Sequence, residues 1–527
     1  MYWGEVNKCG GSSVGDADSI SKLTNILISR VENHPIVVNS AFGSPVGQNI
    51  TKGTDLLKDI EEALNSDDAA KAYKLKAEFV SRVNEIVNGN NLETIVDYAR
   101  SESMRRENIL RKLDFLIENY LNLVRSNVDQ WEREQEELLV REVVRPDPAI
   151  KLLNDVLAFE KFDADNRARL KDSFLGLGEL ITSGLISADL IRKGHQALAI
   201  HPADAGLITD SNFQNAIPVP DYQARIRSYF SHLNSSTHGH RFIPVISGYV
   251  ARDLQGNDTT LGRNSSDWSA AIFARALKIP LIIWKESDGI YDATPIKVNG
   301  GNMIPDTRTL ESVSFDEALE LTSFGTNAIH PKAIEEAKAG GKHLYVRNTF
   351  SPQHRGTKIV TNRIESDGLV KAITILPHVT MLDATCTNSQ FAEILTYLNS
   401  KGIRFPMVSY TLGNVYMVVD MPELSDQIYE KLGSIGLAGS RLTSSKEKYL
   451  IKLVGDGIGS QANYHRILPI LEKLYTVSQQ QTGIYGSKSL FPIEIKHPSS
   501  IGFVTGHRAG PAIANALYDF CIRSRRV

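Results

Sequence analysis

A glycine-rich stretch near the amino end, Lys8-Cys9-Gly10-Gly11-Ser12-Ser13-Val14, constrains the fold of this chain more than any other feature. A short hydrophobic segment from Tyr2 to Val6 precedes it, and residues 16–31 follow with apolar residues at helical spacing. Strand, glycine turn and helix in this order are typical of phosphate sites, because paired glycines let N–H groups approach an anion and a helix N-terminus adds its positive dipole. Lys8 would supply a full charge. A tight connection without a ligand is the alternative, and a Walker A loop is excluded because the lysine precedes the glycines.

Length and composition describe an ordinary soluble enzyme. A chain of 527 residues predicts two or three domains, and 42% hydrophobic with 23% charged residues is usual for a globular protein. The net charge of -3 gives no reason to expect nucleic acid or an anionic membrane as partner. Three widely spaced cysteines argue for a reducing compartment, without a disulfide framework or a zinc cluster. No apolar run approaches the roughly 18 residues that cross a bilayer, so we expect a cytoplasmic protein.

Several short apolar runs predict buried strands, at residues 36–38, 197–200, 243–249 and 279–284. Ligands of open α/β sheets bind where such strands end. After the first of these runs come Ser40 and a polar loop that closes on Thr54 and Asp55, where a hydroxyl either caps a helix or contacts a substrate. After the last come Lys285, Glu286 and Tyr291, a reasonable pocket for a nucleotide base.

Residues from about 61 to 170 are helical and charged in pattern, with one long amphipathic helix expected between about 102 and 141. Packing on the domain or at a dimer contact is the simpler interpretation of this segment. Beyond it, Glu179 stands beside two glycines among leucines, so its carboxylate needs a cationic partner. A substrate ammonium and a structural lysine or arginine are the two candidates.

The densest group of polar residues is the turn from Gly262 to Asp267, which opens a helix of small residues. It combines free N–H groups, hydroxyls, a guanidinium and a carboxylate. Arg263 has the fork geometry that binds a substrate carboxylate. Asp267 would hold Lys8 in position or accept from it. Ser265 or Ser266 as a simple N-cap is the alternative for the hydroxyls, but it does not explain Arg263 and Asp267.

Taken together, these motifs resemble the aspartate kinases of the amino-acid kinase superfamily. The opening motif at 8–15 is similar to their Lys-Phe-Gly-Gly-Thr/Ser-Ser-Val-Gly, and the turn at 262–267 to their Gly-Arg-Asn-Gly-Ser-Asp. Further similar segments, in the same order, lie at 38–43, 178–179, 284–291, 314–332 and 346–350. Ordered motifs over most of the first two thirds of the chain make chance agreement a poor explanation.

The resemblance implies an α/β amino-acid-kinase fold, a mainly parallel open sheet flanked by helices, over residues 1–360, including the helical segment at about 61–170. It implies α+β ferredoxin-like ACT domains at 368–445 and 446–527. There, β-α-β-β patterns occur, with helices expected at 389–399, 423–432 and 510–521. Residues 479–498 have no counterpart in the family pattern.

The resemblance also implies a reaction, in which the side-chain carboxylate of L-aspartate attacks the γ-phosphate of ATP and Mg²⁺ bridges the phosphate oxygens. Lys8 and Asp267 would be catalytic, and no protein metal ligands are implied. The substrate would contact Ser40, Thr54, Glu179, Arg263 and Ser266. Phosphates and nucleotide would contact Lys8, Gly10, Gly11, Ser13, Lys285, Glu286, Tyr291, Asn327 and Ala328. An amino-acid effector at the ACT region and a homodimer or higher homo-oligomer are also implied.

Four residues of the motifs depart from the family pattern. Cys9 replaces an aromatic residue and Ser265 a glycine, whereas Thr294 and Ile296 replace an acid and an arginine, the latter a nucleotide contact in the family. ATP affinity is the property that these last changes affect. A catalytically inactive amino-acid-binding homologue, or a kinase for another acidic amino acid, is therefore the alternative function. The sequence does not identify a feedback effector.

Overall fold

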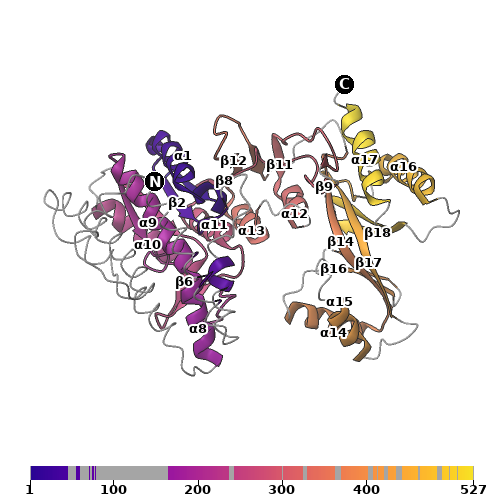
Figure 1. The fold of residues 1–527 in the computed structure, drawn as a ribbon, viewed down its shortest axis with the longest axis horizontal. Coiled ribbons are helices and arrows are strands. Elements are labelled where there is room, and N and C mark those ends of the chain that lie inside the picture. The colour runs from indigo at the N-terminus through magenta and orange to yellow at the C-terminus, as the bar shows by residue number, and fades with distance from the viewer. Residues whose placement is uncertain are drawn as a thin grey trace. The chain divides into compact units, whose positions relative to one another are not determined.

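The computed structural model divides by its contacts into unit 1, Met1–Gly289 with Lys332–Lys358, and unit 2, Ile290–Pro331 with Ile359–Val527 (Figure 1). We describe each unit by itself. The structure describes residues 2–44, 55–59, 71, 74–75, 78, 164–236, 242–298, 301–323, 329–361, 369–400, 407–411, 414–419, 425–434, 442–460, 463–482, 490–497, 499–506 and 509–525. The long helix expected at 102–141 lies outside these residues.

Unit 1 is built on a parallel sheet. Its strands are ordered β12 (Leu344–Asn348), β8 (Leu281–Lys285), β1 (Glu5–Cys9), β2 (Pro35–Asn39), β5 (Phe242–Ser247) and β3 (Gln196–Ile200), and each neighbouring pair is parallel. All residues of β1, β2 and β5 are buried, as expected of parallel strands covered on both faces. The predicted open parallel sheet is confirmed. β13 (Thr357–Val360) crosses from unit 1 to unit 2.

β1 begins at Glu5, later than hydrophobicity predicts, so Lys8 lies inside the strand rather than in the turn. Because this strand contains several polar residues, hydrophobicity alone does not predict it, but each polar side chain has a partner within the protein. Glu5 accepts two hydrogen bonds from Arg30, and Asn7 Oδ1 accepts one from Trp284 Nε1 at 2.9 Å. The strand is therefore specified by pairing as well as by burial.

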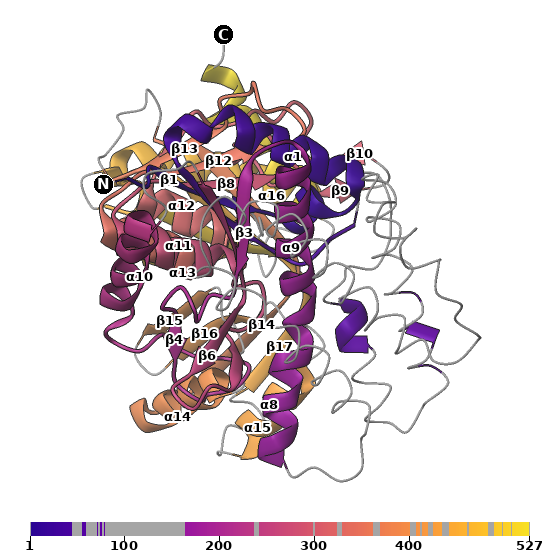
Figure 2. The ribbon, with the colours of Figure 1, turned by 90° about the vertical axis from the view of Figure 1, so that its left-hand side faces the viewer.

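Helices cover both faces of this sheet. α1 (Ala17–Ser29) packs with α9 (Leu177–Arg192), and α10 (Tyr222–Ser236) packs with α11 (Ser266–Leu277). Figure 2 shows the two pairs on either side of the strands. α8 (Ala164–Leu175) precedes α9, and α13 (Pro331–Gly340) precedes β12. A small sheet joins β4 (Ile208–Thr209), β6 (Val250–Asp253) and β7 (Asp258–Thr260).

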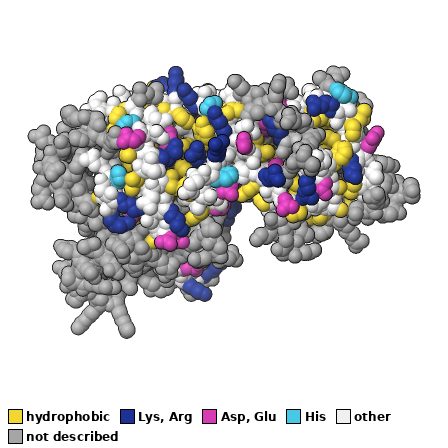
Figure 3. Space-filling model, turned by 90° about the horizontal axis from the view of Figure 1, so that it is seen from above, with side chains coloured by type: hydrophobic (Ala, Val, Ile, Leu, Met, Phe, Trp, Pro, Cys, Tyr) yellow, Lys and Arg dark blue, Asp and Glu magenta, His cyan; other side chains and the backbone are white. Residues whose placement is uncertain are grey.

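One stretch in the described part of the chain, Lys171–Arg192, is long and apolar enough to cross a membrane. In its apolar window, 83% of the residues are buried inside the molecule, as in a core helix. On the face in Figure 3, described Lys and Arg side chains lie among Asp and Glu side chains and hydrophobic ones.

Unit 2 contains a repeated β-α-β-β-α pattern. The first half is β14 (Ala372–Thr385), α14 (Asn388–Ser400), β15 (Met407–Thr411), β16 (Asn414–Val419) and α15 (Ser425–Leu432). The second half is β17 (Leu442–Val454), α16 (Tyr464–Thr482), β18 (Leu490–His497), β19 (Ser500–Gly506) and α17 (Gly510–Cys521). The sheet order is β15-β16-β14-β17-β19-β18, so β14 and β17, the first strands of the two halves, are antiparallel neighbours at its centre. The strand order of the second half is therefore the reverse of that of the first. Figure 1 shows their helices near opposite ends of the sheet.

The repeated pattern confirms the expected ferredoxin-like architecture and the helices predicted at 389–399, 423–432 and 510–521. Each half has its own core: Leu382, Ile394, Met417 and Ile428 belong to one, and Ile451, Ile467, Phe503 and Tyr518 to the other. The segment 479–498, which had no counterpart in the family pattern, contains the end of α16 and the edge strand β18.

Residues 290–331 make their contacts in unit 2, although the family pattern places them before the expected boundary at 360. They contain β9 (Lys297–Val298), β10 (Gly301–Asn302), β11 (Ser312–Ser314) and α12 (Phe315–Ser323). Tyr518 donates to Asp292 at 3.0 Å, Thr294 Oγ1 accepts from the N–H of Ile375 at 3.0 Å, and Ile296 packs on the second core. The departures at Thr294 and Ile296 thus build packing contacts within unit 2.

Candidate active site

Five parallel strands of unit 1 end at the same edge of the sheet, and the residues that follow them form the candidate site. They are Gly10 after β1, Ser40 after β2, Gly248 after β5, Glu286 after β8 and Thr349 after β12. In the register, Cys9 lies beside both Asn39 and Trp284, so the strand ends are level. Open parallel sheets bind their ligands at this edge.

The carboxylate of Asp267 lies between two lysines at this edge. Lys8 Nζ is 2.7 Å from Oδ1 and Lys285 Nζ is 3.5 Å from Oδ2. Lys8 and Asp267 are each only 4% exposed, so water screens these charges weakly. Burial lowers the pKa of Lys285, Lys8 adds to this effect, and Asp267 opposes it. Two cations around one carboxylate leave a positive site for a phosphate, and the predicted contact between Asp267 and Lys8 is confirmed.

Glycines bring two strand-end loops into backbone contact. The N–H of Gly43 donates to the carbonyl of Gly11 at 2.8 Å. A Cβ atom on Gly43 would lie 2.5 Å from the carbonyl carbon of Gly11, closer than any real contact, so only glycine fits. The N–H of Gly10 donates to the carbonyl of Trp284 at 3.0 Å and is therefore used within the sheet.

The N-terminus of α11 lies at the site, and its capping differs from that of α1. The side chain of Asp16 caps α1, accepting from the N–H of Ser19 at 2.7 Å, and this negative charge opposes a phosphate there. In α11, Asp267 stands in the first turn, and the N-cap residue Ser265 makes no capping bond through its side chain. The N-cap explanation therefore does not account for the Ser265 hydroxyl.

The serines of the glycine-rich motif point to different partners. Ser13 is fully buried, and its hydroxyl pairs with that of Thr349 at 2.7 Å. Ser12 donates to Glu286 Oε2 at 2.6 Å. Ser13 is thus tied to the residue after β12, and Ser12 to the predicted residue Glu286 after β8, which holds the motif at the sheet edge.

Ser40 and Ser266, both predicted substrate contacts, are brought together, with their hydroxyls 2.7 Å apart. Arg263 differs, because its side chain is 79% exposed and its guanidinium is 3.8 Å from Asp55. Among the described residues, no hydrogen bond joins Arg263 to Ser266 or Glu179. Its guanidinium is thus largely open to solvent.

Glu179 is a buried carboxyl in the first turn of α9, only 4% exposed. Burial raises its pKa to about 8, against the opposing effects of the Ala41 N–H and of Lys8. Among the described residues no lysine or arginine forms an ion pair with it, and its Oε2 has no hydrogen-bond partner. Lys8 thus acts on this carboxyl through its charge without forming an ion pair with it, and the buried Oε2 is left for a substrate ammonium.

The nucleotide side is described only in part. Lys285 and Glu286 end β8 at the sheet edge, whereas Tyr291 belongs to unit 2, where it bridges to Thr309. Thr54, Asn327 and Ala328 lie outside the described residues. In the part of the chain that is described, no three potential ligands gather into a metal cluster.

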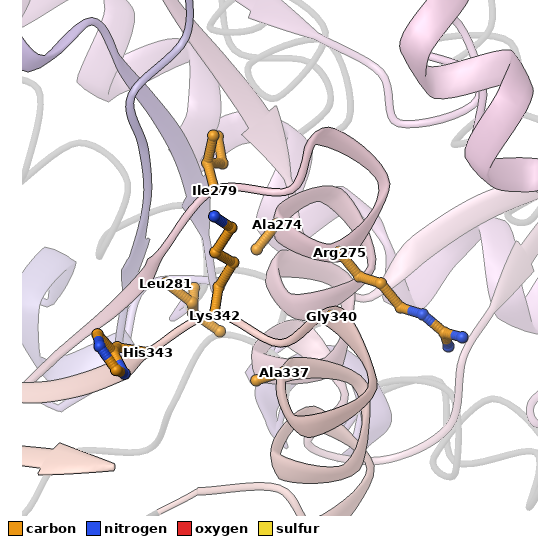
Figure 4. A pocket seen from close by; sticks show the side chains of 8 residues that line it. All are labelled: Ala274, Arg275, Ile279, Leu281, Ala337, Gly340, Lys342 and His343. Carbon is orange, nitrogen blue, oxygen red and sulfur yellow. The ribbon is translucent and has the colours of Figure 1, made fainter. Parts of the chain in front are cut away.

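A small hollow in unit 1 lies away from this edge. Figure 4 shows its lining by Ala274, Arg275, Ile279, Leu281, Ala337, Gly340, Lys342 and His343. Leu281 is the first residue of β8, whereas Lys285 is the last, so the hollow lies at the opposite end of the strand. None of the predicted site residues lines it.

Three residues at the site were not predicted. Ser12 stands inside the glycine-rich motif, and Thr349 stands in the similar segment at 346–350, so both were within reach of motif comparison. Asp172 stands two helical turns before Glu179. Its buried contacts with the turn before Arg263 join segments that are distant in sequence, and no local pattern reveals them.

Known proteins resemble this chain along most of its length. Aspartokinase 2, chloroplastic, of Arabidopsis thaliana is 25% identical over 491 residues, which cover 90% of this chain and 76% of that protein. The aspartokinase of Helicobacter pylori is 34% identical over 210 residues, which cover 40% of this chain and 48% of that one.

Solved structures agree in fold. Escherichia coli aspartokinase III in complex with aspartate and ADP matches with a TM-score of 0.68 at 18% identity, over 98% of this chain and 99% of that one. The same enzyme in complex with lysine and aspartate also matches with a TM-score of 0.68, at 19% identity, over 99% of this chain and 100% of that one.

The sequence profile described as amino acid kinase family matches residues 5–348. That range contains the strand-edge glycines, Lys8, Glu179, Asp267 and Lys285. The chain therefore belongs to the amino acid kinase family.

Proposed function

We propose that this protein is an ATP-dependent aspartate kinase, which phosphorylates the side-chain carboxylate of L-aspartate to give 4-phospho-L-aspartate. This reaction is the first step of the aspartate-family pathway to lysine, threonine and methionine. The observation that carries the proposal is the pair of lysines around the buried Asp267, Lys8 buried and Lys285 partly buried, at the carboxyl edge of the sheet. The aspartokinases among its relatives support the choice of substrate.

In the reaction, an oxygen of the aspartate side chain attacks the γ-phosphorus while the bond to the β–γ bridging oxygen breaks, releasing ADP. Such a transfer depends on positioning and on stabilising charge. Lys8 and Lys285 would neutralise the phosphate oxygens as charge moves toward ADP. Asp267 would hold both ammonium groups at fixed positions, so little reorganisation is needed during transfer.

On the substrate side, Glu179 would pair with the ammonium of aspartate and Arg263 with its α-carboxylate. Ser40 and Ser266, whose hydroxyls lie 2.7 Å apart, would donate to the side-chain carboxylate, and Thr54 would be a further substrate contact, as the resemblance implies. The unpaired Oε2 of Glu179 supports this role, because a buried acid without a cation gains most from an ammonium ligand.

On the nucleotide side, Gly10, Gly11 and Ser13 would shape the phosphate loop, with Lys285 and Glu286 close to the phosphates. Tyr291, Asn327 and Ala328 would contact the nucleoside. Mg²⁺ would arrive bound to the phosphates of ATP, as part of the substrate. Replacement of the family arginine by Ile296, which packs in unit 2, predicts weaker ATP binding than in relatives that keep it.

We further propose that the paired β-α-β-β-α halves of unit 2 form an ACT region that binds an amino-acid effector, in a cytoplasmic homodimer or higher homo-oligomer. Support comes from the resemblance in fold to an aspartokinase solved in complex with lysine.

The proposal is tested by ADP release from MgATP in the presence of L-aspartate or L-glutamate. Release with aspartate far above that with glutamate is expected. Equal rates would favour a kinase for other acidic amino acids. If folded protein that binds aspartate releases no ADP with either acid, an inactive homologue would be favoured.

A further inference from the structure

Asp172 on α8 is a fully buried carboxylate. Its Oδ2 accepts from the N–H of Gln214 at 2.7 Å and from the N–H of Thr260 at 2.8 Å, and its Oδ1 accepts from the Thr260 hydroxyl at 2.9 Å. Among the described residues, no lysine or arginine forms an ion pair with it. Burial raises its pKa to about 6, against the opposing effect of these three bonds, so the carboxylate is ionised at neutral pH.

These bonds join two segments to α8. Gln214 lies in a loop with a left-handed backbone, φ 70°, and Thr260 ends β7. The N–H of Ala216 donates to the carbonyl of Thr260 at 2.9 Å, which ties the same loop to the same strand end. Asp172 therefore links the loop at Gln214 and the end of β7 to α8 through its carboxylate.

The strand end leads directly into the turn that carries Arg263. Gly262 has φ +91°, and a Cβ atom there would lie 2.8 Å from Asn215 Oδ1, so the loop packs directly against the turn. The N–H of Leu261 donates to the carbonyl of Tyr249 at 3.0 Å. The backbone before Gly262 is thus anchored by Asp172 and by the loop that Asp172 holds, and separately by Tyr249, the residue before β6.

We propose that Asp172 is a positioning residue for substrate binding, which fixes the backbone from Thr260 to Arg263 and so places the exposed guanidinium of Arg263 for the substrate α-carboxylate. The inference rests on the proposed function, because Arg263 is assigned to the substrate there. Arg263 itself is 79% exposed and has few contacts of its own, so its place depends on the backbone beneath it.

The contacts predict how substitutions behave. Asp172→Ala removes both acceptor oxygens and with them all three hydrogen bonds, so the N–H groups of Gln214 and Thr260 lose this acceptor and the Michaelis constant for aspartate should rise about 10- to 100-fold. Asp172→Asn should show only a small rise in the Michaelis constant for aspartate. The amide oxygen of Asn accepts both N–H groups, and its amide nitrogen donates to the Thr260 hydroxyl. The Michaelis constant for ATP and kcat should change less than about threefold in both.

Asp253 is the matched control. It is 3% exposed and accepts from the N–H groups of Gln255 and Asn257, but it lies at the other end of the β6–β7 hairpin from Thr260. Asp253→Ala should lower stability without raising the Michaelis constant for aspartate.

The test measures steady-state constants for Asp172→Ala, Arg263→Ala and the double variant. If Asp172 acts through Arg263, the Michaelis constant of the double variant for aspartate should be no higher than that of the single variant with the higher constant. Effects that multiply, or an equal rise in the Michaelis constant for ATP, would overturn the inference.

Hydrogen exchange of residues 260–264 gives a readout that needs no activity. Faster exchange in Asp172→Ala than in Asp253→Ala is expected, and unchanged exchange would overturn the inference. Absence of turnover in the wild type would refute the proposed function instead, while the exchange comparison would still decide whether Asp172 orders the turn.

Discussion

Binding of L-aspartate should release a proton from Glu179. Burial raises the pKa of this carboxyl to about 8, so it is mostly protonated at pH 7 before the substrate binds. Pairing with the substrate ammonium favours the ionised form and returns the pKa toward its ordinary range. From these values, about 0.9 proton per site should be released at pH 7 and about 0.2 at pH 8.5.

The assay is titration calorimetry of aspartate binding at pH 7 in two buffers of different ionisation enthalpy. The difference in heat between the buffers gives the number of protons released. Glu179→Gln keeps the size of the side chain but cannot ionise, so its proton release should be lost and its affinity lowered. Proton release near zero in the wild type at pH 7, or proton uptake, would refute the assignment of Glu179 to the ammonium.

The same carboxyl makes a prediction for stability without ligand. Because its folded pKa of about 8 lies above the unfolded value, the protonated side chain favours the folded state at low pH, and this contribution is lost as the pH rises toward 8. Relative to Glu179→Gln, the wild type should lose about 1.4 kcal/mol per pH unit between roughly pH 5 and pH 8, with no further loss above. Urea unfolding at several pH values measures this difference, and a flat difference would contradict it.

Three further predictions follow from buried charges and a helix cap. Asp267→Asn should lower kcat on the order of 10²- to 10³-fold, because both lysines lose the anion that positions them; steady-state kinetics on folded protein checks this, and an unchanged kcat would contradict it. Lys452→Ala breaks its buried pair with Glu320 and should destabilise unit 2 by about 3–5 kcal/mol, whereas the half-buried Lys448→Ala on the same strand should cost far less in urea unfolding. Asp16→Ala should cost about 1 kcal/mol through loss of the α1 cap and leave the Michaelis constant for ATP unchanged.

Much of the fold could be predicted from local pattern. The strands predicted at 36–38, 197–200, 243–249 and 279–284 correspond to β2, β3, β5 and β8, because short apolar runs of this kind are typical of buried parallel strands. β1 was misplaced, since Glu5, Asn7 and Lys8 are polar and their burial depends on partners from distant segments.

The site was predictable where one motif carries the chemistry and unpredictable where contacts between motifs decide it. Lys8 and Asp267 meet as the resemblance implies. The capping of α1 depends on the contact between Asp16 and Ser19, and the assignment of residues 290–331 to unit 2 depends on contacts with β14 and α17. Neither contact leaves a periodic signal in the sequence.

Formation of an acyl phosphate tests the central claim most directly. The protein is incubated with MgATP, L-aspartate and hydroxylamine, which traps the mixed anhydride as a hydroxamate, with L-glutamate and Lys8→Ala as controls. The account predicts hydroxamate with aspartate and the wild type, little with glutamate, and none with the variant, because the buried ammonium beside Asp267 is lost. Undiminished hydroxamate from Lys8→Ala, or none from folded wild type, would contradict it.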